Sequence, residues 1–402
     1  MPLDVRYRPS IRLAYASLAA WGLWIIWAVL TRRDLADPSL APIHFLLLGV
    51  GFAGNLVMGL AHHLTAHFSA RRPPPPWLPS VEATLVGAAT AGGLYALLYA
   101  AAWLLPWASL AWALALAVFA AGLLFQMRGR PLTSVAAFAN GLPGDRVSDA
   151  LQFVIVGYAL FAGAAAWLDG MIAPPAVHLW LVGVVALTIF MVTHRVLPRF
   201  SRKWMPKWVH WSQGALASVG PVLLAIGMGH SRRLALWGGT LEYAAVVLYV
   251  LLVAYAWIHR KNQHPAVAFP ALGAGFLFFG VNLGILVLHN SDLYGRIGVH
   301  AVNNLFGFVV LTTLGMASAM LGLGVMATTE RANRRVWRLG LAATIVLVCW
   351  EALAWWRSPA AAYFALGLGA VALVQASWVI RLKFAGKPIV PRSLVIPMKP
   401  QP

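Results

Sequence analysis

Long apolar runs recur along the whole sequence and restrict its fold more than any other feature. An α-helix needs about 20 residues to cross the hydrocarbon core of a bilayer. Hydrophobic residues make up 61% of the chain and charged residues only 10%, which excludes a water-soluble domain. The sequence therefore predicts a single all-helical transmembrane domain over residues 1–402, with twelve membrane-spanning helices. We expect them at residues 13–31, 43–64, 81–105, 107–127, 151–171, 176–197, 209–228, 234–258, 267–289, 297–321, 336–354 and 360–380, with a short gap near Pro106.

Lysine and arginine residues sort to one side of these predicted helices. If the N-terminus is cytoplasmic, only six of the 30 face outward, which leaves 30 − 6 = 24 in cytoplasmic segments. Because basic residues collect in cytoplasmic loops, we expect both termini there, in a multi-pass protein of a bacterial-type inner membrane. The net charge of +19 then reflects topology and attraction to anionic lipid, not nucleic acid. The outward six are Arg32, Arg33, Arg232, Arg233, Arg296 and Arg357.

The single cysteine, Cys349, falls inside a predicted span. Disulfides, thiolate metal sites and covalent haem attachment through C-x-x-C-H are therefore not expected. The last residues, 384–402, are proline-rich, and we interpret them as a flexible tail.

A hydrophobic segment with a histidine at its entrance occurs three times. The histidines are His44 (PIHFLLLGVGFAGNLVMGLAHHLTAHF), His178 (VHLWLVGVVALTIFMVTHRVLPRF) and His300 (VHAVNNLFGFVVLTTLGMASAML). Their spacings are 178 − 44 = 134 and 300 − 178 = 122 residues, and each segment is the second helix of a predicted group of four. This periodicity predicts three pseudo-symmetric groups. The repeats cover about residues 1–135, 136–264 and 265–383.

The twelve histidines fall into two predicted layers. Neutral imidazole binds haem iron and copper, and histidines at equal depth on separate helices can hold a porphyrin between them. Polar residues at the membrane interface are the alternative interpretation. We interpret the inner layer as solvated or lipid-facing beside arginine-rich loops, with His62 and His63 as the candidates for exceptions. The outer layer contains His44, His178, His230, His289 and His300; the inner layer contains His62, His63, His67, His194, His210, His259 and His264.

Two further residue types bear on chemistry. Arginines at the outer helix ends can hold haem propionates, although ordinary helix-end arginines are the alternative. Glu242, near the middle of the eighth predicted helix, is the leading proton-path candidate, and a carboxylate paired with a neighbouring hydroxyl or amide is equally consistent with its position. The arginine candidates are Arg232, Arg233, Arg296 and Arg357.

The pattern resembles subunit I of the haem-copper oxidases and the NnrS-type membrane haem-copper proteins. Twelve helices in three groups, with histidines on helices 2, 6 and 10, carry the resemblance. It implies haem b bound through His44 and His300, copper at His178, and propionates held by Arg357.

The sequence departs from both families at their signature motifs. The oxidases have a His-His pair on helix 7 and a His-x-His on helix 10, whereas this chain has His210 at the inner end of helix 7 and a single His300 followed by AVNN. The NnrS signature W-H-x-H-E is replaced by APIHF. We expect His289 and His230 to complete a non-standard metal site with His178.

The resemblance implies a haem-binding protein that handles electrons or a diatomic gas, O2 or NO, in respiration or nitric oxide metabolism. Its partner is then a small redox subunit or a cytochrome, and an oxidoreductase activity is left open. The alternative is a cofactor-free secondary transporter with a histidine proton relay, and a structural membrane subunit is a third interpretation. Transporters place ionisable groups near the midplane, whereas most of these histidines lie toward the edges.

Overall fold

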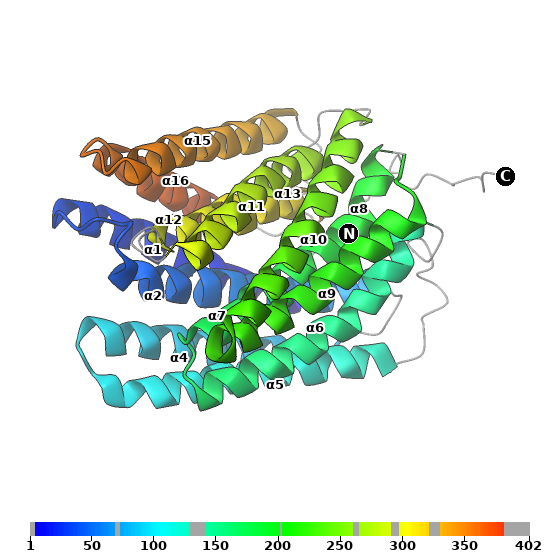
Figure 1. Cartoon of the computed structure of the whole chain (residues 1–402), viewed down its shortest axis with the longest axis horizontal. Coiled ribbons are helices and arrows are strands. Elements are labelled where there is room, and N and C mark those ends of the chain that lie inside the picture. The colour runs from blue at the N-terminus through cyan, green and yellow to red at the C-terminus, as the bar shows by residue number, and fades with distance from the viewer. Residues whose placement is uncertain are drawn as a thin grey trace.

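The computed structural model describes residues 5–68, 73–128, 142–201, 203–259, 265–290, 297–320 and 330–381. Every regular element in these ranges is a helix (Figure 1). Twelve of the described helical segments are long and apolar enough to cross a membrane. The chain therefore has the architecture of a multi-pass membrane protein. The predicted tail at 384–402 lies outside the described residues.

Nine of the described spans each contain one α-helix, which in the fourth span follows the short 3-10 helix η4 (Ala102–Leu104). The second, sixth and tenth each contain an α-helix, a π-helical stretch and a second α-helix, and the second span begins with the 3-10 helix η2 (Pro38–Leu40). The single helices are α1 (Arg8–Leu30), α4 (Leu78–Leu98), α5 (Leu105–Arg128), α6 (Pro143–Leu168), α9 (Lys207–His230), α10 (Arg232–Ile258), α11 (Pro265–His289), α15 (Glu330–Trp355) and α16 (Ala361–Arg381). The three composite spans are α2 (Ala41–His44), η3 (Phe45–Gly54) and α3 (Asn55–Phe68); α7 (Pro174–His178), η6 (Leu179–Ala186) and α8 (Leu187–Ser201); and α12 (Ile297–Val302), η8 (Asn303–Val310) and α13 (Leu311–Met320).

All twelve spans lie where the hydropathy predicts them, but the predicted turn between the third and fourth is wrong. The third helix ends at Leu98, and the chain turns at Tyr99–Ala101, where Ala100 has a φ of 52°. Pro106 lies in the first turn of α5. A proline is tolerated there because the first N–H groups of a helix have no intrahelical partner.

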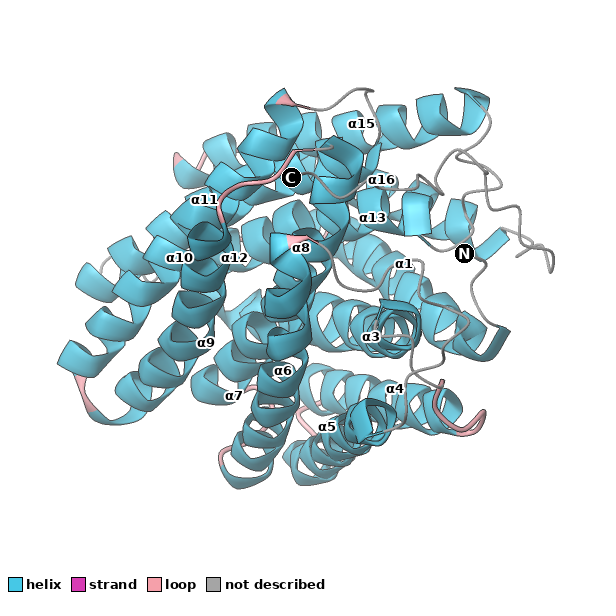
Figure 2. Cartoon of the chain, turned by 90° about the vertical axis from the view of Figure 1, so that its right-hand side faces the viewer, coloured by secondary structure: helices cyan, strands magenta, loops and turns pink. Residues whose placement is uncertain are grey.

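The three composite spans lie at the centre of the bundle. In their most apolar windows, 94%, 78% and 78% of the residues are buried, against 33–50% for the other nine spans described. The nine surround them: each packs against the next in chain order, and α16 packs back against α1. Figure 2 shows α3 between α1 and α5, both of which it contacts. The central spans are the three histidine-led segments.

Each central span contains a π-helical stretch close behind its histidine. The stretches η3 and η6 begin directly after His44 and His178, and η8 begins three residues after His300. π-Helices are rare, and most are single turns at functional sites. These three stretches contain eight to ten residues each. The same unusual backbone therefore recurs at corresponding places in the three histidine-led segments.

Buried tryptophans join the central helices to one another and to their surroundings. The indole N–H of Trp180, in η6, donates to the carbonyl of Gly49, in η3, over 2.9 Å. Trp21 of α1 stacks on Phe306 of η8, with ring centroids 5.2 Å apart. A buried indole needs such a partner for its N–H. The three central spans are thus held by specific polar and aromatic contacts as well as by apolar packing.

Glycines allow α9 and α10 to approach closely, and we predict that Gly238→Ala destabilises the fold. A Cβ on Gly238 would overlap the backbone nitrogen of Leu224. Overpacking of this kind costs about 1–3 kcal/mol, which thermal unfolding of the detergent-solubilised protein would detect as a lower midpoint. Gly87→Ala is the matched control because a Cβ on Gly87 meets nothing within 4 Å. Equal midpoints for the two variants would contradict the prediction.

Candidate functional site

His44 ends α2 and is fully buried. The indole N–H of Trp21 donates to its Nδ1 over 3.0 Å, and its Nε2 donates to the carbonyl of Leu35 over 3.3 Å. The Trp24 ring lies edge-on, with centroids 4.9 Å apart. Both imidazole nitrogens therefore have protein partners. Binding of iron would require His44 to give up its bond to Leu35, so its role as a haem ligand stays a prediction.

His300 has a different environment. Its Nδ1 lies 2.9 Å from the carbonyl of Gly280 on α11, an acceptor, so this nitrogen carries the proton. The bond fixes the tautomer that leaves Nε2 unprotonated, which is the form that binds metals. The amide nitrogen of Asn304 lies 3.3 Å from Nδ1 and 3.5 Å from Nε2, so it is a hydrogen-bond donor within reach of the unprotonated Nε2. Gly284 gives the imidazole room, since a Cβ there would be 3.1 Å from its Cε1.

His178 is paired with Glu242. Nε2 of the histidine, on α7, lies 2.7 Å from Oε1 of the glutamate, on α10, and the two side chains are 22% and 8% exposed. The sequence left open a hydroxyl or amide partner for Glu242, and the structure gives it an imidazole. Gly220 of α9 lies against this carboxylate, because a Cβ there would be 2.7 Å from its Cγ. His178 is also close enough to His300 to interact with it electrostatically.

His230 and His289 lie exposed at helix ends. Each Nδ1 bonds to a carbonyl four residues earlier in its own helix, that of Ile226 or Ile285. Such contacts are ordinary for histidines at a helix C-terminus. Within the described ranges, no group of three or more His, Cys, Asp or Glu side chains is arranged to hold a metal ion. His178, His230 and His289 are thus not brought together as one such group, and the copper site stays a prediction.

Three of the four arginine candidates, Arg232, Arg233 and Arg357, lie at the same end as these histidines. Arg232 donates to the carbonyls of Leu288 and His289, which ties the start of α10 to the end of α11. Arg357 is exposed in the turn between α15 and α16 and has a φ of 52°. Arg296 lies outside the described residues. The propionate-binding role of Arg357 stays a prediction.

The inner histidines correct the sequence analysis. His62, His63, His194 and His210 were expected to be mainly solvated or lipid-facing, with the first two as the candidates for exceptions, but all four are at most 2% exposed. The sequence did contain a sign of this: His62 follows His44 by 18 residues and His194 follows His178 by 16, so the inner histidines repeat as well. The partners of His62, His194 and His210 are polar residues of other spans.

His62 lies in a buried network with Glu82 and Gln126. The side-chain N–H of Gln126 donates to the carbonyl of His62, which turns the Gln126 amide oxygen toward Nδ1 of the ring, 2.7 Å away. That nitrogen must therefore be protonated. Nε2 meets Oε1 of Glu82 at 2.8 Å, with both residues at most 1% exposed. One proton is shared between imidazole and carboxylate, and Gly122 leaves space for the ring.

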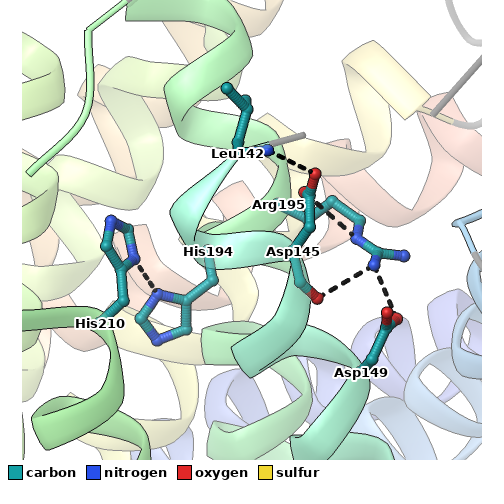
Figure 3. A network of polar contacts seen from close by, with 6 residues as sticks. All are labelled: Leu142, Asp145, Asp149, His194, Arg195 and His210. Carbon is teal, nitrogen blue, oxygen red and sulfur yellow. Dashed lines mark hydrogen bonds and ion pairs between the residues drawn. The ribbon is translucent and has the colours of Figure 1, made fainter. Parts of the chain in front are cut away.

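A second inner network surrounds His194 (Figure 3). Its Nδ1 lies 2.8 Å from Nδ1 of His210, and its Nε2 lies 2.7 Å from Oε1 of Gln213. The next residue, Arg195, points to the other side of α8 and donates to Oδ1 of Asp149 over 2.6 Å. Arg195 also lies 3.5 Å from a carboxylate oxygen of Asp145. Consecutive residues of α8 thus anchor two polar clusters.

No protein-family model matches this sequence, and no curated protein matches it. The functional conclusions therefore rest on the geometry of the histidine sites.

We predict that Glu82→Ala destabilises the protein strongly, because it removes the carboxylate that shares a proton with buried His62. Breaking a buried pair from one side costs about 3–5 kcal/mol. Thermal unfolding in detergent would show the loss as a large drop in midpoint. Ser80→Ala is the control, since Ser80 is exposed in the same turn of α4. A midpoint for Glu82→Ala within error of that control would refute the prediction.

Proposed function

We propose that this protein is a haem-binding integral membrane protein with the architecture of haem-copper oxidase subunit I and NnrS-type proteins. In this proposal the twelve helices form three groups of four, each with its histidine-led helix at the centre. The central burial of those three helices and the π-helix in each support the arrangement. The distribution of lysine and arginine supports cytoplasmic termini and a bacterial-type inner membrane.

The environment of His300 is the observation that carries the proposal. A metal-ligating histidine donates the N–H of its second ring nitrogen to a carboxylate, a backbone carbonyl or water, which orients the imidazole and raises its basicity. His300 does this with the carbonyl of Gly280, and the small residue Gly284 lies beside the ring. His300 is the protein ligand in this proposal. His44 is the second ligand by resemblance, on the condition that it releases Leu35.

A bound haem b would supply one-electron transfer and an iron site for a diatomic gas such as O2 or NO. The residues around His300 would supply proton handling: Nε2 of His178 lies 2.7 Å from Oε1 of Glu242, within hydrogen-bond distance. Copper at His178, and a small redox subunit or cytochrome as electron donor, complete the proposal. Reduction of O2 or NO consumes both electrons and protons. In this proposal the His178–Glu242 pair supplies the protons.

A second function, a proton-coupled secondary transporter without cofactor, is favoured by one specific observation. Two separate imidazole–carboxylate pairs, His178–Glu242 and His62–Glu82, lie on the central helices and their neighbours. Ionisable groups inside membrane spans mark proton and substrate pathways. The pair at His178 belongs to the entrance of one histidine-led helix and the pair at His62 to the exit of another, so a relay would have sites toward both ends of the bundle.

The two proposed functions predict different absorption spectra and different metal contents for the purified protein. The protein would be purified in detergent from a haem-replete host, and reduced-minus-oxidised absorption spectra would be recorded together with iron and copper analysis. We expect reduced-haem bands in the wild type and a loss of haem per protein of more than about tenfold in His300→Ala. His44→Ala tests the second ligand separately. His259→Ala is the control because its Nδ1 bonds only to the carbonyl of Tyr255 in its own helix.

A colourless wild-type protein without iron would overturn the haem proposal. The transporter would then be tested in liposomes, by following internal pH while candidate substrates are added. If His300→Ala keeps as much haem as the wild type, His300 is not a haem ligand, although the protein still binds haem.

A further inference from the structure

The contact between His194 and His210 joins two buried imidazoles, and its proton can be located. Nε2 of His194 faces the amide oxygen of Gln213, so this nitrogen is protonated. A neutral His194 then has a bare Nδ1, and the N–H in the 2.8 Å contact belongs to Nδ1 of His210. Neutral His210 is left with a bare Nε2. That nitrogen is buried and has no hydrogen-bond partner among the described residues.

A small cavity adjoins this imidazole. Its volume is about 20 Å³, which is room for a single water. The cavity lies between the end of α8, the segment that follows it and the start of α9, so it is at one end of the bundle rather than in its middle. His210, Lys203, Trp204 and Tyr255 are among its lining residues. A bare, buried imidazole nitrogen is a proton acceptor, and the cavity that His210 lines has room for a water that could deliver the proton.

We propose that His194 and His210 form a site that takes up one proton from the adjoining aqueous phase through this cavity. A proton from water bonds to Nε2 of His210. The N–H bond at Nδ1 of His210 breaks, and that proton bonds to Nδ1 of His194. His194 becomes the imidazolium, still donating from Nε2 to Gln213, while His210 is again neutral. The site gains one proton and one positive charge, and release reverses the same steps.

The charges around the pair come from several elements. On α6, Asp145 interacts electrostatically with His210, and Gly144 lies against both histidines. The carboxylates of Asp145 and Asp149 contact Arg195, the residue next to His194. Burial of both imidazoles is the largest influence and disfavours the imidazolium. Positive charge close to the pair also opposes it, whereas negative charge favours it. The other titratable groups at the cavity are Lys203 in the segment after α8 and Tyr255 of α10.

The site is independent of the proposed haem function, since it lies at the exit of the sixth span and His300 lies at the entrance of the tenth. A protein that moves electrons or substrates across a membrane together with protons needs a place where protons enter. The pair has two features of such a place: both imidazoles are buried, and a water-sized cavity adjoins them.

The test uses the full chain, purified and placed in lipid films, with infrared difference spectra recorded between low and high pH. Ring ¹⁵N labelling identifies the histidine bands. Because the two residues share one proton, His194→Gln and His210→Gln should each remove the same pH-dependent imidazolium band. His259→Gln, at the same end of the molecule but outside the pair, should leave that band in place. A band that survives in either pair variant would overturn the proposal.

If the variants do not fold, the proposal can be tested on the wild type. The imidazole C–H hydrogens of its histidines exchange with deuterium in D2O, and mass spectrometry measures this exchange. This exchange reports the protonation of each histidine separately. We expect His194 and His210 to exchange with one common midpoint pH, because they titrate as a unit. Two different midpoints, or no exchange at either residue while surface histidines exchange fully, would refute the shared site.

Discussion

The need to give every buried imidazole a partner organises the interior of this protein. A polar group in a bilayer core has no water to hydrogen-bond with, so each histidine on the central spans must form its hydrogen bonds within the protein. His44 finds an indole and a carbonyl, His62 a carboxylate and an amide, and His194 a second imidazole. The carbonyl is that of Leu35, in the segment after α1, and the other partners lie on helices α1, α4, α5 and α9. The histidines therefore help to fix which helices surround the centre.

The sequence was sufficient to predict where the membrane-spanning helices lie, but not which side chains they bring into contact. Hydropathy located all twelve spans because the bilayer imposes a length on each. It misplaced the turn before α5, where the apolar run continues through the exposed residues Tyr99 and Trp103. Apolar character cannot separate a residue facing lipid from one in a turn at the interface. The histidine at the entrance of three segments did single out the helices that the fold places at its centre.

The candidate site was harder to predict for a physical reason. Whether a histidine is a ligand, a proton carrier or a helix end depends on side chains that arrive from other helices. Glu82 and Gln126 lie 20 and 64 residues beyond His62, and no local pattern links them. His230 and His289 have the same predicted depth as His178 and yet bond only to their own helices. Depth can be read from sequence, whereas the direction of a side chain requires the packed bundle.

The π-helical stretches decide which neighbours the two histidines of one helix meet. His44 and His62 are separated by 18 residues, which is five full turns at 3.6 residues per turn. An unbroken α-helix would place both on one side. With ten π-helical residues between them, His44 faces α1 while His62 meets α4 and α5. The wide π-helical turns thus rotate the second half of the helix relative to the first. As a result, one membrane-spanning segment directs its two imidazoles toward two different groups of helices.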